Sequence, residues 1–283
     1  MSTFYCLYNS TSPDSLNLSD RVELLAAACQ KLNIVFYALD ESTVDFSNLP
    51  TPTKNDGLYN CGRGSYLLES VLLNSEVKHF YRSVPFLSQK DDSNQLAVQL
   101  EKSGIPVPKT IYKGTNNKLL LKKYVEYLDG FPIILKTHGG TGGVGVIKIN
   151  DFDTLLSMSD YLHSQNCNFQ LKQFIPSASC ERLCVLGDSV LYSLTRPIKE
   201  QDFRNEIAKT GNQFLTFPKE IQEVAIKAAH SANYNYAGVD LIIDKRNNLP
   251  YILEVNCPQN FAIHQKIIQI DFAFHMLKWL FKI

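Results

Sequence analysis

The chain has 283 residues, of which 45% are hydrophobic and 20% are charged, a composition that excludes an intrinsically disordered protein. Its 28 basic residues balance 28 acidic ones, so the net charge gives no reason to expect nucleic acid or an anionic membrane as the main partner. The length suffices for one large domain or for two to three small ones.

The first third of the chain predicts a small α/β unit. Apolar runs at residues 4–8 and 34–39 are typical of buried strands. The helix between them begins near Leu18, where Ser19 or Asp20 can cap it, and ends at Lys31. Residues 48–58 contain two prolines and a glycine and predict a loop.

The rest of the chain predicts two further α+β units. In the first, helices are expected at residues 93–103 and 153–164, and strands at 131–136 and 144–149 on either side of a glycine-rich turn. In the second, strands are expected at residues 169–174, 182–186, 189–195, 238–243 and 251–255, and helices at 218–232 and 267–283. Charged residues interrupt the last segment, which predicts a core helix rather than a membrane span.

The glycine-rich turn KTHGGTGGVG, residues 136–145, is the first candidate site. Glycines let the backbone approach a ligand closely, and successive N–H groups can hold phosphate oxygens. Lys136, at the end of the preceding strand, would reach the same anion as a point charge. The turn is neither a Walker A loop nor a GxGxxG motif, because no helix follows it. A flexible hairpin remains an alternative on composition alone.

Asp240, Glu254 and Asn256 form the second candidate site, on two predicted antiparallel strands with apolar neighbours. Burying such carboxylates is costly unless something pairs with them. Glu254 and Asn256 are two residues apart and therefore point to the same face of their strand. Mg²⁺ takes one or two carboxylates plus phosphate oxygens. The residue types alone leave an ion pair at the strand end as the alternative.

A third group lies between these two segments and is mostly basic: Arg182, Arg196, Lys199, Arg204 and Asn205. A phosphoryl-transfer site needs cations at the transferred phosphate and at an anionic substrate. For any single arginine, a surface ion pair is the alternative.

The order and spacing of these segments resemble the ATP-grasp superfamily, in particular its glutamate-ligase branch and the ATP-grasp enzymes that modify ribosomal peptides. GVDLI followed by LEVN is the most specific shared motif. The resemblance implies the ATP-grasp fold, of the α/β (α+β) class, with a small N-terminal α/β domain and two α+β lobes that clasp ATP. The expected domains are residues 1–90, a central lid subdomain at 91–168, and a C-terminal subdomain with the metal site at 169–283.

The resemblance also implies roles for individual residues. The ATP phosphates would be held by Lys136, Gly139, Gly140, Thr141, Gly142 and Gly143. The rest of the nucleotide site would comprise Gln173, Phe174 and Ile175 at the adenine hinge, Glu181 at the ribose, and Arg182 just after the hinge. Arg196 and Arg204 would be catalytic cations near the γ-phosphate. Asp240, Glu254 and Asn256 would bind Mg²⁺, expected as two ions for which Mn²⁺ could substitute.

Several positions depart from the family pattern. Ser93 replaces a lysine that normally contacts the nucleotide, Gln173 replaces a hinge glutamate, and Cys180 replaces an acidic residue. Residues 257–260, CPQN, differ from the usual loop near the acceptor substrate. These departures allow an unusual acceptor or weakened catalysis.

The implied function is an ATP-dependent ligase that activates a carboxylate as an acyl phosphate and joins it to an amine. ADP and phosphate would be released, and the substrate would be an amino acid, a peptide or a protein tail. A second hypothesis is an ATP-binding module without ligase activity. A third is a kinase that releases the acyl phosphate. The chain shows no convincing Ser-His-Asp or Cys-His arrangement for a side-chain nucleophile.

The seven cysteines form no CxxC motif and no zinc pattern, which favours thiols in a reducing cytoplasm. The N-terminal residues lack the features of a signal peptide. We therefore expect a cytoplasmic enzyme without a nucleic-acid or membrane partner, and the resemblance allows a homo-oligomer. His138, His264 and Arg63 are further candidates for contacts with phosphate, acceptor and substrate, against the alternative of surface or helix-cap residues.

Overall fold

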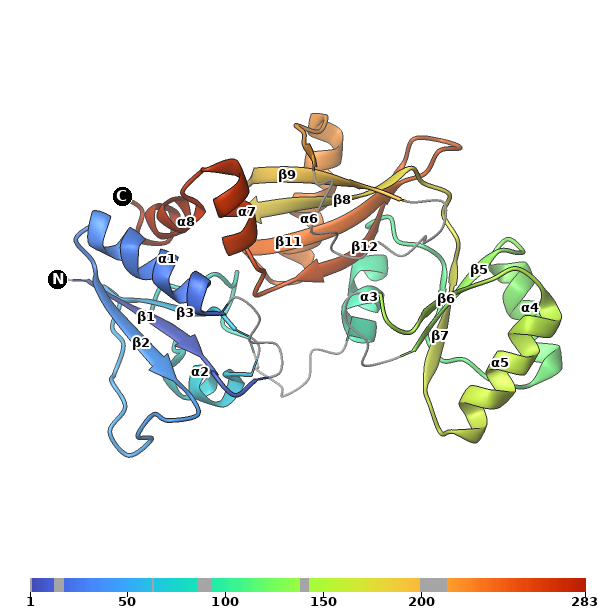
Figure 1. Cartoon of the computed structure of the whole chain (residues 1–283), viewed down its shortest axis with the longest axis horizontal. Coiled ribbons are helices and arrows are strands. Elements are labelled where there is room, and N and C mark those ends of the chain that lie inside the picture. Colours follow the sequence, from blue (N-terminus) through green and yellow to red (C-terminus); the bar gives the residue numbers. More distant parts are fainter. Residues whose placement is uncertain (1, 13–17, 63, 86–92, 138–142, 199–212) are drawn as a thin grey trace.

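The computed structural model describes residues 2–12, 18–62, 64–85, 93–137, 143–198 and 213–283. Within these ranges the strands form three sheets, with the orders β2-β1-β3, β4-β7-β5-β6 and β10-β9-β8-β11-β12. Figure 1 shows the five-stranded sheet between the other two. None of the described helices is both long and apolar enough to cross a membrane.

The N-terminal sheet is parallel and comprises β1 (Thr3–Tyr8), β2 (Val35–Asp40) and β3 (Gly57–Asn60), with helices α1 (Leu18–Lys31) and α2 (Tyr66–Leu72). The predicted strand–helix–strand order is confirmed, and α1 has the expected bounds. β3 was not predicted, since it begins at the end of the proline-containing loop. Its residues are all buried, so pairing with β1 outweighs the local turn signals.

The four-stranded sheet comprises β4 (Thr110–Ile111), β5 (Ile133–Thr137), β6 (Val146–Ile149) and β7 (Phe169–Gln173). Helices α4 (Lys118–Tyr127) and α5 (Phe152–Ser164) contribute to its core, which includes Leu121, Leu135, Ile149, Leu155 and Leu171. β7 pairs with β4 and β5, so it belongs to this sheet, whereas the sequence-based boundary falls before it. Strand pairing, which the sequence does not reveal, therefore places Phe169–Gln173 in this sheet, and the domain boundary itself stays a prediction.

The antiparallel five-stranded sheet comprises β8 (Ser179–Leu186), β9 (Ser189–Pro197), β10 (Gln213–Phe214), β11 (Tyr236–Ile243) and β12 (Pro250–Asn256). One face shares an apolar core with α6 (Lys219–Ser231) and α3 (Ser93–Lys102). The sequence groups α3 with the central unit, but Leu96 and Leu100 pack with this sheet. The opposite face is therefore the one that can present polar groups.

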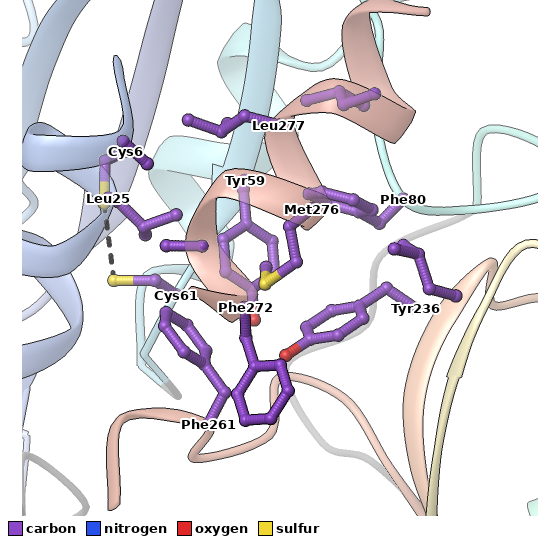
Figure 2. Close-up of a cluster of buried hydrophobic side chains, with 14 of the residues drawn as sticks. Cys6, Leu25, Tyr59, Cys61, Phe80, Tyr236, Phe261, Phe272, Met276 and Leu277 are labelled. Carbon is purple, nitrogen blue, oxygen red and sulfur yellow. Dashed lines mark hydrogen bonds between the residues drawn. The ribbon is translucent and has the colours of Figure 1, made fainter. Parts of the chain in front are cut away.

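The predicted C-terminal helix is two helices, α7 (Ala262–Ile268) and α8 (Phe272–Phe281). Gln269 adopts a left-handed conformation that ends α7, and the side chain of Asp271 accepts a hydrogen bond from the N–H of Phe274 to cap α8. The α8 residues Phe272, Met276 and Leu277 join β1, β3 and β11 in one core, where Figure 2 shows Tyr59, Phe80 and Tyr236 together. This core fixes the N-terminal sheet to the five-stranded sheet.

Candidate functional site

Charged residues gather on the face of the five-stranded sheet that lies opposite α6. Strand register places Asp240 of β11 between Arg182 of β8 and Glu254 of β12. Cross-strand partners point to the same face, and Asn256 follows Glu254 by two residues, so all four side chains share that face. The structure thus brings together the three expected metal ligands and one of the expected nucleotide contacts.

Asp240 is the centre of this cluster and is 8% exposed. Arg182 donates to it through Nε at 2.8 Å and through a terminal nitrogen at 2.5 Å, a bidentate pair. Arg196 lies 3.6 Å from its Oδ1, and the amide nitrogen of Asn256 donates to its Oδ2 at 3.2 Å. Burial alone would lower the pKa of Arg182, but Asp240 outweighs this effect and raises the pKa above its usual range. The aspartate therefore holds both arginines in place.

The oxygens on this face fit a hard divalent cation. Glu254 is exposed on β12, while Asp240 is deeply buried, and Asn256 points its nitrogen at Asp240, so its carbonyl oxygen is the atom that could ligate. Among the described residues, no three side chains drawn from His, Cys, Asp and Glu lie together in a way that could hold a metal ion. The set that fits is thus two carboxylates with one amide, completed by phosphate oxygens in the manner usual for Mg²⁺.

Three lysines line one face of the four-stranded sheet. Ile134 of β5 pairs with Lys148 of β6 and with Lys172 of β7, and Lys136 follows Ile134 by two residues. Side-chain alternation therefore puts the three ammonium groups on the face that does not pack on α4 and α5. The Lys148 ammonium lies 4.4 Å from the ring centroid of Phe174, a cation–π contact with a predicted hinge residue.

Lys172 is the functional candidate that the sequence interpretation missed. Burial, reinforced by the charge of Lys136, lowers its pKa to about 8, while Glu254 acts in the opposite direction. Glu254 of β12 is thus near enough to Lys172 of β7 to influence its pKa, although the two residues belong to different sheets. The only sequence feature that could have pointed to Lys172 was a single lysine within the apolar pattern of β7. A strand with one polar face shows the same feature, so it did not single out Lys172.

The glycine-rich turn is described at Lys136 and Thr137, which end β5, and again from Gly143, which has a φ of +82°. Gly145 has a φ of +79°, and a Cβ there would lie 2.1 Å from Oγ1 of Thr137. Only glycine suits this position, since both the backbone and the space exclude a side chain. His138, Gly139, Gly140, Thr141 and Gly142 lie outside the described residues, as do Arg63, Lys199, Arg204 and Asn205.

The hinge prediction concerns Gln173, Phe174 and Ile175. Gln173 donates through its side chain to Asp129 at 2.5 Å and through its backbone N–H to Lys109 at 2.9 Å. Lys109 in turn forms an ion pair with Asp129. The Gln173 side chain is thus part of a polar contact within the lobe, and the adenine role of the hinge stays a prediction.

Glu181, the residue expected at the ribose, lies on the far side of the sheet from the charged face. Glu181 alternates with Arg182 and so points to the opposite face of β8, where Ser179 donates to it at 2.5 Å. Its role at the ribose stays a prediction.

His264 is buried rather than exposed, with Nδ1 2.7 Å from the hydroxyl of Tyr192. Burial, followed by the charges of Arg182 and Arg196, lowers the His264 pKa to about 4.

A family model described as the RimK-like ATP-grasp domain matches residues 88–280. The chain therefore belongs to the RimK-like ATP-grasp family. It is 31% identical over 160 residues to a ribosomal protein bS6–L-glutamate ligase of Escherichia coli. This match covers 55% of this chain and 52% of that protein. The chain thus matches about half the length of these curated relatives.

Solved structures support the same fold along the whole chain. The ATP-grasp ligase PsnB in complex with a minimal precursor has a TM-score of 0.71 at 15% identity, covering 100% of this chain and 99% of that chain. The D-alanine–D-alanine ligase of Bacillus anthracis has a TM-score of 0.69 at 16% identity, covering 100% and 97%. The predicted α/β (α+β) class and the ATP-grasp fold are confirmed.

Proposed function

We propose that the protein is an ATP-dependent ligase that joins a carboxylate to an amine. The observation that carries this proposal is a pair of charged sheet faces, with Lys136 and Lys172 on one and Glu254 beside Asp240 on the other. Together with Lys148, Arg182 and Arg196 the two faces supply five cationic side chains and two carboxylates. This excess of positive charge suits a polyphosphate accompanied by a divalent cation.

The proposed nucleotide site uses Lys136, the loop through Gly143, the hinge at 173–175, Glu181 and Arg182. Asp240, Glu254 and Asn256 would hold Mg²⁺, as two ions or with Mn²⁺ in substitution, and the metal would neutralise phosphate charge. The substrate carboxylate attacks the γ-phosphorus to form an acyl phosphate and ADP. The amine then attacks the acyl carbon and expels phosphate, while Arg196 and Arg204 stabilise the developing charge.

Release of ADP and phosphate from MgATP, screened across amino acids and peptides, tests this proposal. We expect turnover with at least one carboxylate–amine pair and its loss in Glu254→Ala. Glu76→Ala, at an exposed acidic position outside the site, is the matched control and should retain full activity. Full activity in Glu254→Ala would contradict the metal assignment, and phosphorylated acid that accumulates despite added amine would favour a kinase.

An ATP-binding module without ligation is the second candidate. It is motivated by the departures from the family pattern at Ser93, Gln173 and Cys180. Calorimetry that detects ATP binding, combined with no turnover across the substrate screen, would select this alternative.

The relatives support a proposal for the substrate class. One acts on ribosomal protein bS6, and the PsnB structures contain precursor peptides. We propose a peptide or protein tail, or a free amino acid, as the acceptor or donor in a cytoplasmic reaction. The proposal includes no nucleic-acid or membrane partner and allows a homo-oligomer, which light scattering of the purified protein would test.

A further inference from the structure

The face of the four-stranded sheet that carries Lys136, Lys148 and Lys172 has a feature that the family resemblance does not explain. The lysine that the family pattern places at the start of this region is absent, because Ser93, the first residue of α3, stands there. Lys172 instead lies on β7, beside the strand that ends in the glycine-rich turn. We propose that Lys172 is a nucleotide-binding residue that contacts the ATP phosphates and replaces this missing cation.

Strand register supports this assignment. Ile134 is the direct partner of both Lys148 and Lys172, and Lys136 lies one position further along the same face of β5. Lys172 and Lys136 are therefore diagonal neighbours, which brings two long side chains within reach of one ligand. The Lys148 ammonium is directed at Phe174, whereas Lys172 is under the electrostatic influence of Lys136 and Glu254. Lys172 is thus a neighbour of Lys136, the expected phosphate contact, and its pKa is also influenced by Glu254, an expected metal ligand.

The charges on this face also support the assignment of Lys172 as a phosphate contact. None of the three lysines forms an ion pair with a residue in the described ranges. Each is half-buried, so these like charges share a face where solvent screens them only in part. A polyphosphate would supply the opposite charge that the unliganded protein lacks. The proposal rests on the nucleotide half of the proposed function and not on the identity of the substrates.

The proposal predicts two effects of opposite sign for Lys172→Met. The variant should bind MgADP about tenfold to a hundredfold more weakly, the range typical of a lost hydrogen bond to a charged group. Its affinity for adenosine should be unchanged, because adenosine has no phosphate. The unliganded variant should unfold at a higher temperature than the wild type, since one buried repulsive charge is gone. A merely structural role would not produce this combination.

Calorimetric titration with MgADP and adenosine, together with thermal unfolding, provides the test. Lys123→Met is the matched control, an exposed lysine on α4 beyond the opposite face of the same sheet, and should change neither affinity. Lys172→Arg should recover most of the MgADP affinity. Equal binding of MgADP by Lys172→Met and the wild type, or an equal loss of adenosine binding, would overturn the proposal.

The outcomes also separate this inference from the proposed ligase activity. A wild-type protein that binds MgADP but never turns over contradicts the ligase while the Lys172 comparison still stands. Normal ligation with unchanged MgADP binding in Lys172→Met contradicts only the role of Lys172. A wild-type protein that binds no MgADP overturns both.

Discussion

The two sheets that contribute to the candidate site hold their charged side chains in different ways. On the five-stranded sheet, Asp240 engages Arg182 in a bidentate pair and holds Arg196 nearby. On the four-stranded sheet, Lys136, Lys148 and Lys172 share one face, and Lys148 has an aromatic ring as its neighbour. The first face is organised by its own ion pairs, while the second would be completed by the proposed nucleotide. We infer that the first sets the geometry of the reaction and the second sets nucleotide affinity.

Removing the centre of the organised face should have the largest effect. Asp240→Ala leaves Arg182 buried without its counter-ion, which typically costs about 3–5 kcal/mol of stability. Denaturant unfolding would measure this loss, with the exposed Asp160→Ala on α5 as the control. Replacing both partners, Arg182→Met with Asp240→Leu, should recover much of the stability but no activity. A single variant that loses less than about 1 kcal/mol would show that the pair is not a structural anchor.

Low pH should reduce the stability of the folded protein through His264, whose pKa is influenced by Arg182 and Arg196 of the five-stranded sheet. Its folded-state pKa of about 4 lies below the ordinary value of 6.5, so the unfolded chain takes up a proton that the folded protein resists. This contribution to stability is complete above pH 6.5 and is lost as the pH falls towards 4, by at most about 3 kcal/mol. Unfolding measured between pH 7 and pH 4 should show this slope in the wild type and a smaller one in His264→Gln. Identical slopes would contradict the assignment.

The turn that leads into the lysine face should be sensitive to a single methyl group. Gly145→Ala introduces strain at a positive φ and a contact of the new Cβ with Thr137, for a cost of about 2 kcal/mol. Gly130→Ala is a matched control, because its φ of +85° is similar but no atom lies within 4 Å of the added Cβ. Thermal unfolding should therefore rank the wild type above Gly130→Ala and Gly130→Ala above Gly145→Ala. Equal losses would assign the whole effect to the backbone.

Local patterns predicted much of the candidate site, but not how its members are used. Asp240, Glu254 and Asn256 were identified by a motif, and the structure places them on one face. The sequence did not show that Asp240 is committed to Arg182, because that contact joins residues 58 positions apart. Lys172 was missed for a similar reason: its importance depends on β5 and β12, neither of which is adjacent to it in the chain. The individual roles of these residues stay predictions.

The amino-acid sequence by itself determined the features that depend on near neighbours. Apolar periodicity fixed α1, β1, β2 and the hairpin of β8 and β9 close to their observed bounds, although Ser19 and Asp20, the expected caps of α1, lie within the helix. Tertiary structure alone decided the features that depend on distant partners. It assigned β7 to the four-stranded sheet and α3 to the core of the five-stranded one, and it joined α8 to the N-terminal sheet. Hydrogen bonding and burial between segments far apart in the chain contribute to these arrangements, and a local pattern carries no record of them.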